Sequence, residues 1–108
     1  MTEKRFDEVV DEVCEQIRFV LKHKAKEYRR CNNPFHNFDI GSQRSGLIHE
    51  KVLDGFLLKH EISIADMTSD LEEGILPSKE ILDEKFGDNI IYLIIKKASI
   101  IDKIERDE

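Results

Sequence analysis

The segment Glu84–Ile95 constrains the fold of this 108-residue chain more than any other part of the sequence. An acidic stretch interrupted by Gly87 runs directly into Ile90–Ile95, an almost wholly apolar run of six residues. Such a run is far too short to cross a membrane, which takes about 20 apolar residues. A helix that is apolar on nearly all sides must lie at the centre of a bundle or be covered by another subunit. The sequence therefore predicts a helical bundle and favours a homo-oligomer.

Composition predicts one soluble, helix-rich domain covering residues 1–108. Apolar residues make up 40% of the chain and charged residues 37%, a mixture typical of globular proteins rather than disordered ones. The net charge of -6 argues against general nucleic-acid binding. No secretory signal pattern is present, so we expect a cytoplasmic protein in which Cys14 and Cys31 are reduced thiols. No membrane partner is expected.

Three long amphipathic helices are predicted, at residues 4–30, 47–73 and 79–106, from apolar residues repeated at three- and four-residue intervals. Residues 31–46 read as a loop followed by a short turn of helix. Gly74 is expected to end the second helix, and Ser78 to cap the third. Gly55, inside the second helix, suggests close approach of another helix or a ligand. The predicted fold class is an all-α antiparallel bundle of three long helices plus a short one.

Polar residues on the second and third helices form the first candidate site. Lys59 and Asp66 lie on one side of the second helix, while Glu84, Lys85 and Asp88 open the third, with Tyr92 one turn further on. Antiparallel pairing of the two helices would bring these groups together. Carboxylates from facing helices suit a magnesium ion. The alternative is a salt-bridge network, with Lys59 against Asp88 and Asp66 against Lys85.

The loop after the first helix is a second candidate site. Arg29 and Arg30 precede Phe35-His36-Asn37-Phe38, in which two aromatic rings bracket two hydrogen-bonding side chains. Arginine favours phosphate, aromatic rings offer a stacking surface for a base, and Asn or His can bond its edge. The alternative is a loop fixed to the end of the bundle by its phenylalanines. No pairing of a nucleophile with a base stands out elsewhere in the sequence.

These motifs, taken in order, resemble the MazG-like all-α nucleoside triphosphate pyrophosphohydrolases, most closely their small phage-borne relatives. The resemblance rests on residues 33–38, on Leu57-Leu58-Lys59-His60 with Asp66, and on residues 84–93. It implies a bundle, commonly oligomeric, that binds nucleotides with magnesium held by acidic residues on two helices. On this resemblance Asp66, Glu84 and Asp88 are the expected metal ligands. Glu84 and Asp88 are also the expected catalytic residues, releasing pyrophosphate from a triphosphate.

Two departures from the family pattern weaken the expectation of hydrolysis. The second helix lacks the family's pair of glutamates three residues apart, and Lys85 stands where a further glutamate is expected. An ammonium in place of a carboxylate favours direct phosphate binding by Lys59 and Lys85. Three hypotheses remain: a magnesium-dependent pyrophosphohydrolase, a non-catalytic phage-type protein that sequesters a cyclic or signalling nucleotide in the host cytoplasm, and a helical protein-interaction module.

Overall fold

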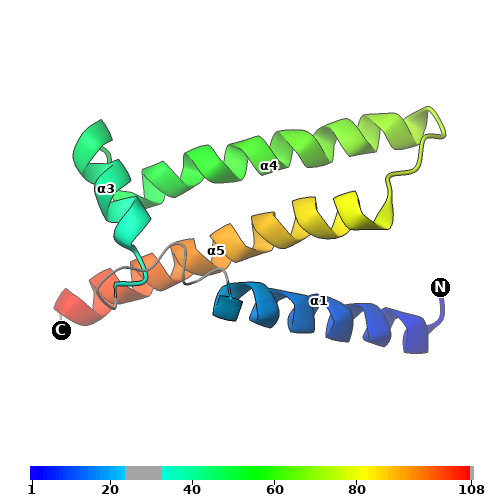
Figure 1. Ribbon diagram of the computed structural model, residues 1–108, viewed down its shortest axis with the longest axis horizontal. Helices are drawn as coiled ribbons and strands as arrows, with labels where there is room; N and C mark the ends of the chain where they lie inside the picture. Colours follow the sequence, from blue (N-terminus) through cyan, green and yellow to red (C-terminus); the bar gives the residue numbers. More distant parts are fainter. Residues whose placement is uncertain (24–32, 108) are drawn as a thin grey trace.

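The fold is all-α, as predicted. The computed structural model describes residues 1–23 and 33–107, and these ranges contain four helices and no strand (Figure 1). The helices are α1 (Glu3–His23), α3 (His36–Ser45), α4 (His49–Glu72) and α5 (Lys79–Asp107). The prediction of three long helices and one short one is confirmed within these ranges. The predicted continuation of the first helix to residue 30 lies outside the described residues.

The turn between α4 and α5 has the two end signals that the sequence predicts. Gly74 has a φ of 78°, and its N–H donates to the carbonyl of Leu71 at 3.0 Å. The N–H of Ile75 donates to the carbonyl of Asp70 at 2.9 Å, which completes a Schellman motif. At the start of α5 the Ser78 hydroxyl accepts the N–H of Ile81 at 3.2 Å, so the predicted N-cap is confirmed.

Helices α4 and α5 pack side by side in opposite directions (Figure 1). Their register is set by contacts along the pair, because residue numbers fall on α5 as they rise on α4. These contacts are Glu50 with Lys103, Asp54 with Lys96, and His60 with Tyr92. In this register Lys59 lies level with Tyr92. The same spacing, continued along the pair, would set Ser63 level with Asp88 and Asp66 level with Glu84.

Helix α3 corrects the prediction of a loop at residues 36–38, whereas Phe35 lies in the turn before the helix. Asn33 organises the helix start, since its side-chain oxygen accepts the N–H of Phe35 at 3.0 Å and its amide donates to Asp39 at 2.5 Å. Phe38 is buried on α4, and this packing outweighs the turn-forming composition of the segment. The close approach expected at Gly55 occurs instead at Gly41, where an added Cβ would lie 3.0 Å from Val52 Cγ1.

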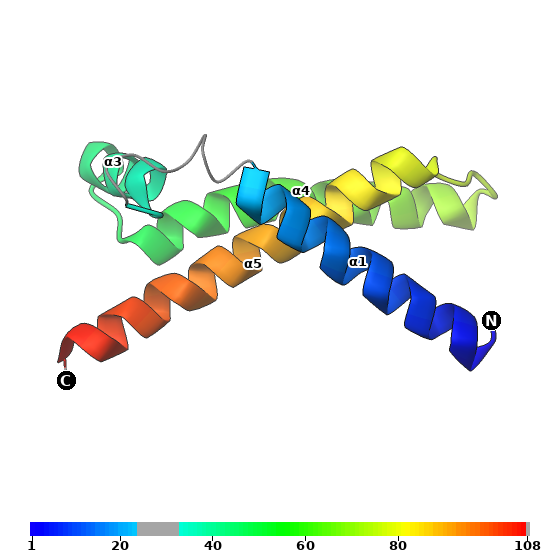
Figure 2. The same ribbon diagram turned by 60° about the horizontal axis from the view of Figure 1, so that its bottom comes forward.

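Helix α1 lies against α5 and crosses it at a wide angle (Figure 2). The two helices run in the same direction, as the ribbon shows (Figure 1). The crossing passes near Gly87, where an added Cβ would lie 3.9 Å from Gln16 Nε2. Helix α1 has no fully buried residue, and Phe6 and Phe19 stay exposed. This helix therefore covers one side of α5 without closing the bundle.

The described chain encloses a small core, and much apolar surface stays in contact with water. The buried apolar side chains are Phe38, Leu53, Leu57 and Ile91. The accessible surface is 8366 Å², whereas a folded monomer of 12.6 kDa exposes roughly 6,200 Å². The radius of gyration is 16.3 Å, against about 13 Å for a compact domain of this length. Within the described residues, no helix is long and apolar enough to cross a membrane.

Candidate functional site

One exposed flank of α4 carries an ordered row of functional groups, which we call the α4 strip: Phe56, Lys59, Ser63 and Asp66. The spacings of three and four residues place these side chains next to one another along the helix. Phe56, Lys59 and Asp66 are exposed and Ser63 is half-buried. The α4–α5 register sets the strip level with residues 84–92 of α5. The meeting of the Asp66 end of α4 with Glu84 stays a prediction, because the contacts that define the register involve Glu50, Asp54 and His60 of α4.

The charged groups at this end of the helix pair do not neutralise one another. Within residues 1–23 and 33–107, no ion pair includes Lys59, Asp66, Glu84, Lys85 or Asp88. The alternative salt-bridge network, Lys59 to Asp88 and Asp66 to Lys85, is therefore not formed in the described structure. These side chains remain available to a ligand or to water.

A row of aromatic rings adjoins the α4 strip. Phe56 stacks on Tyr92 with ring centroids 5.3 Å apart and planes 15° apart. His60 stacks on the same Tyr92, at 5.4 Å and 20°. Phe38 meets Phe56 edge-on at 6.1 Å. Phe56 is the outermost ring described in this row, with 44% of its surface exposed.

Two buried polar atoms lack hydrogen-bond partners among the described atoms: His60 Nδ1, in the aromatic row, and Asn89 Oδ1, on α5. His60 is 8% exposed, so its ring is held between α4 and α5. An unsatisfied buried polar atom costs about 1–3 kcal/mol. In a native protein such an atom calls for an explanation, such as an ordered water or an ion.

Lys85 lies on a different flank from Lys59. It precedes Lys103 by 18 residues, which is five helical turns, so both lysines leave α5 in the same direction. Lys103 pairs with Glu50 on α4, and the residue five turns after Glu50 is Thr68. The Thr68 hydroxyl donates to the Ile64 carbonyl of its own helix at 3.1 Å. If the register continues unchanged along the pair, Thr68 takes the place opposite Lys85 that Glu50 takes opposite Lys103.

The segment expected to stack on a base is placed mostly by α3. Phe38 is 2% exposed and belongs to the core, so its ring offers no open face to a ligand. Phe35 and His36 are half-buried, and the Phe35 ring lies 6.0 Å from that of His49. Asn37 is exposed. The two arginines of this expected site, Arg29 and Arg30, lie outside the described residues.

The donor set expected for magnesium does not fit a metal site in this structure. Among the described residues, no three or more His, Cys, Asp or Glu side chains are grouped closely enough to hold an ion. Asp66, Glu84 and Asp88 are therefore not gathered around a common point. A hard cation such as magnesium needs several oxygen ligands in near-ideal octahedral geometry.

The opposite end of the α4–α5 pair carries a connected polar cluster, here called the α3 junction: Asp39, His49, Glu50, Ser99 and Lys103. His49 Nε2 pairs with Asp39, and His49 Nδ1 lies 3.4 Å from the Ser99 hydroxyl. That hydroxyl donates to Glu50 at 3.2 Å, and Glu50 also pairs with Lys103. A pocket of about 230 Å³ opens beside the cluster and is lined also by Ser42, Ile48, Asp102 and Arg106.

The α3 junction is best understood as a structural connection between three helices. Ser99 is 2% exposed and already donates to Glu50. His49 contacts both Asp39 and Ser99, and Ser99 donates to Glu50, so the cluster joins α3, α4 and α5. Burial raises the pKa of Glu50, but hydrogen bonds from Lys103, a backbone N–H and Ser99, together with the Lys103 charge, outweigh it. The resulting pKa of Glu50 lies below its ordinary value.

The sequence did not allow this cluster or the exposure of Phe56 to be predicted. Ser99 is a small polar residue within an apolar helix, and that contrast was the available signal. His49 and Glu50 open α4, far from α5 in the sequence, so their pairing depends on the register of the two helices. Phe56 follows the apolar period of α4 and reads as a core residue, although 44% of it is exposed.

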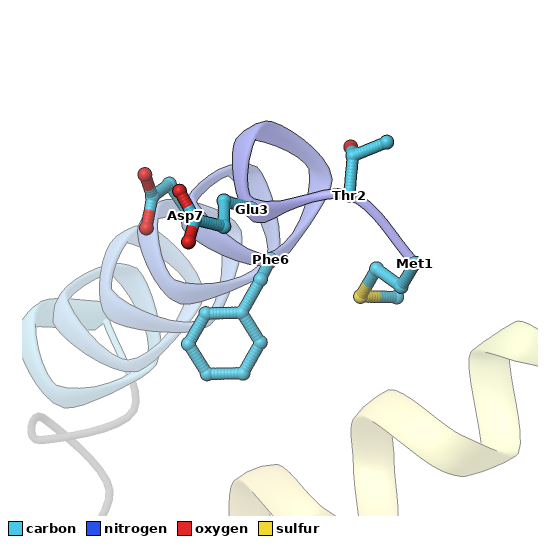
Figure 3. A pocket seen from close by; sticks show the side chains of 5 residues that line it. All are labelled: Met1, Thr2, Glu3, Phe6 and Asp7. Atoms are coloured by element: carbon cyan, nitrogen blue, oxygen red, sulfur yellow. The ribbon is translucent and has the colours of Figure 1, made fainter.

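A further hollow, of about 470 Å³, lies at the start of α1 (Figure 3). Its lining residues are Met1, Thr2, Glu3, Phe6 and Asp7, all from the first two turns of the chain. Figure 3 shows Phe6 and Met1 on one side of the helix, with Asp7 turned away from them. The hollow holds two carboxylates and no facing group from another helix, so it has no arrangement suited to catalysis.

Comparisons with known proteins leave the family open. No protein-family model matches the chain, and neither a curated protein nor a solved structure shows significant similarity to it. The resemblance to MazG-like proteins therefore stays a prediction from the motifs.

Proposed function

We propose that the chain binds a nucleotide along the α4 strip, with the base on Phe56 and the phosphate at Lys59. The observation that carries this proposal is the absence, within the described residues, of ion pairs at a charged edge that adjoins an exposed aromatic row. Elsewhere on the same helix pair, Lys96 and Lys103 are paired with carboxylates. Lys59, without an ion-pair partner among the described residues, lies next to the exposed Phe56 ring. This combination suits a ligand that is both anionic and planar.

Base stacking on Phe56 extends a row of rings that already exists. Tyr92 supports Phe56 from α5, so the ring is held in place before a ligand arrives. Stacking of a base on an aromatic side chain is worth about 1–3 kcal/mol. The orphaned Nδ1 of His60 lies beside the same row and is a candidate partner for a ligand atom or an ordered water.

The charges along the strip favour a nucleotide of low charge. Asp66 follows Lys59 by seven residues, about two helical turns, on the side of α4 that runs along Glu84 of α5. These carboxylates repel the outer phosphates of a triphosphate, while a single phosphate at Lys59 stays close to the cation. We therefore expect mono- and cyclic nucleotides to bind more tightly than triphosphates when no divalent ion is present. This fits the non-catalytic, sequestering role among the hypotheses.

A thermal-shift screen of mono-, cyclic and triphosphate nucleotides, with and without magnesium, tests the proposal. We expect stabilisation by low-charge nucleotides that persists in EDTA and is lost in Lys59→Ala. Affinity should fall at least about tenfold, as expected for loss of a charged hydrogen bond. Lys96→Ala is the matched control, because Lys96 is committed to Asp54. No stabilisation by any nucleotide would contradict nucleotide binding as a whole.

The level position of Asp66 and Glu84 favours one further candidate function, magnesium-dependent pyrophosphate release from a triphosphate. Among the described residues these carboxylates do not form a group close enough to hold an ion. Hydrolysis is therefore less well supported than nucleotide sequestration. Triphosphate binding that requires magnesium, together with pyrophosphate in the products, would favour the enzyme. Recovery of intact ligand after denaturation would favour sequestration.

We also propose that the chain acts as a homo-oligomer, in the cytoplasm where nucleotides are abundant. The support is its accessible surface of 8366 Å², which exceeds the roughly 6,200 Å² expected of a compact monomer. Sedimentation of the purified chain tests the assembly. A mass of 12.6 kDa at all concentrations would contradict it.

A further inference from the structure

The outer face of α5 is a nearly continuous apolar surface that the rest of the described chain leaves uncovered. It consists of Leu82, Phe86, Leu93, Ile100 and Ile104, each between 40% and 55% exposed. Leu82 and Ile100 are each nine residues from the buried Ile91, which is two and a half turns and so the opposite side of the helix. Ile91 lies among the buried core residues, whereas Leu82 and Ile100 point away from them. We propose that a second copy of this chain covers the outer face, with two α5 helices packed antiparallel about Leu93.

The spacing of the outer face suits pairing with itself. Relative to Leu93, the other four residues lie at positions -11, -7, +7 and +11, so the pattern reads the same in both directions. A twofold interface must be self-complementary, with residue i meeting residue j in both copies. Antiparallel pairing about Leu93 sets Leu82 opposite Ile104 of the partner subunit and Phe86 opposite the partner's Ile100. Every exposed apolar residue of the face then meets another.

The one charge within this face selects the antiparallel orientation. Lys97 lies four residues after Leu93, and Asn89 lies four residues before it. Parallel pairing in register would set Lys97 against the partner's Lys97, which is repulsive in a partly dehydrated contact. Antiparallel pairing avoids this repulsion, because it sets Lys97 level with the partner's Asn89, which carries no charge.

The amount of exposed surface also matches a dimer. The chain exposes 8366 Å², roughly 2,200 Å² more than a compact monomer of its mass. A stable interface buries about 800 Å² on each partner. The excess is thus large enough to supply one such interface, and α5 offers its longest apolar contact. This inference rests on the proposed homo-oligomer and is independent of nucleotide binding.

A pair of variants tests the outer face. Leu93→Glu should convert a species of about 25 kDa, twice 12.6 kDa, into one of 12.6 kDa in sedimentation velocity. Leu58→Glu is the matched control, since Leu58 is exposed on α4 at 56% and outside the face; its mass should equal that of the unmodified chain. Circular dichroism confirms that both variants stay helical. If the unmodified chain is oligomeric and Leu93→Glu leaves its mass unchanged, the assembly stands and the proposed face is wrong.

Cysteine cross-linking tests the orientation, in a background with Cys14→Ser and Cys31→Ser. A mixture of Phe86→Cys and Ile100→Cys chains should form a disulfide-linked dimer, because the two positions face each other. Phe86→Cys alone should not, since its two copies would lie 14 residues apart along the pair, roughly 21 Å, beyond the reach of a disulfide. Leu93→Cys should link to itself. Efficient self-linking of Phe86→Cys would indicate a parallel pair and overturn the antiparallel arrangement.

Discussion

The two ends of the α4–α5 pair use their charges in opposite ways. At the α3 junction, Glu50 bonds to Lys103 and Ser99 while Asp54 bonds to Lys96. Five turns along the pair, Lys85 occupies the direction of Lys103, but Thr68 stands where Glu50 would be. Within the described residues, Lys103 is thus held in an ion pair, whereas Lys85 has no ion-pair partner.

Removing Glu50 from the α3 junction should lower the free energy of unfolding more than any other change proposed here. Glu50→Ala removes the acceptor for both Lys103 and the buried Ser99 hydroxyl. Loss of hydrogen bonds to a charged group costs about 1.5–3 kcal/mol each when buried, and exposure of Lys103 reduces its share. We expect a decrease of roughly 2 kcal/mol in the free energy of unfolding by urea. Glu61→Ala, an exposed carboxylate on the same helix, should change it by less than about 0.5 kcal/mol.

The pH dependence of stability should come partly from Glu50. Its pKa is lower in the folded chain than its ordinary value, so the unfolded state binds the proton more tightly. The stabilisation is complete above the unfolded pKa of about 4.3, and it is lost as pH falls through the lower folded pKa. Thermal melts between pH 7 and pH 3 should therefore show a steeper loss for the unmodified chain than for Glu50→Gln. Equal slopes would show that Glu50 does not contribute.

A new ion pair at Lys85 should have the smallest effect on stability, and its effect on binding distinguishes Lys85 from Lys59 as the phosphate contact. Thr68→Glu places a carboxylate five turns after Glu50, in position to meet Lys85. A partly exposed ion pair adds about 0.5 kcal/mol, measured by urea denaturation against Thr68→Gln as the neutral control. If Lys85 takes part in phosphate binding, Thr68→Glu should also weaken nucleotide affinity. If Lys59 alone holds the phosphate, affinity should be nearly unchanged.

Local signals allowed the helices and their ends to be predicted, while the contents of the site were predicted only in part. Ser78 and Gly74 act through bonds to residues three to five positions away, so the sequence is enough to locate them. Phe38 illustrates the opposite case. Its spacing next to His36 and Asn37 suggests a ligand-stacking loop, but packing on α4 turns the segment into a helix and buries the ring.

From the sequence alone come the all-α class, the positions of the long helices, and the segment of α5 that is apolar on nearly all sides. Each of these follows from periodicity and composition, which depend on neighbouring residues. The cluster of His49, Ser99 and Glu50, and the exposure of Phe56 beside Tyr92, come from the tertiary structure alone. These contacts join residues far apart in the chain. Their formation depends on how two helices align, and local pattern does not encode that alignment.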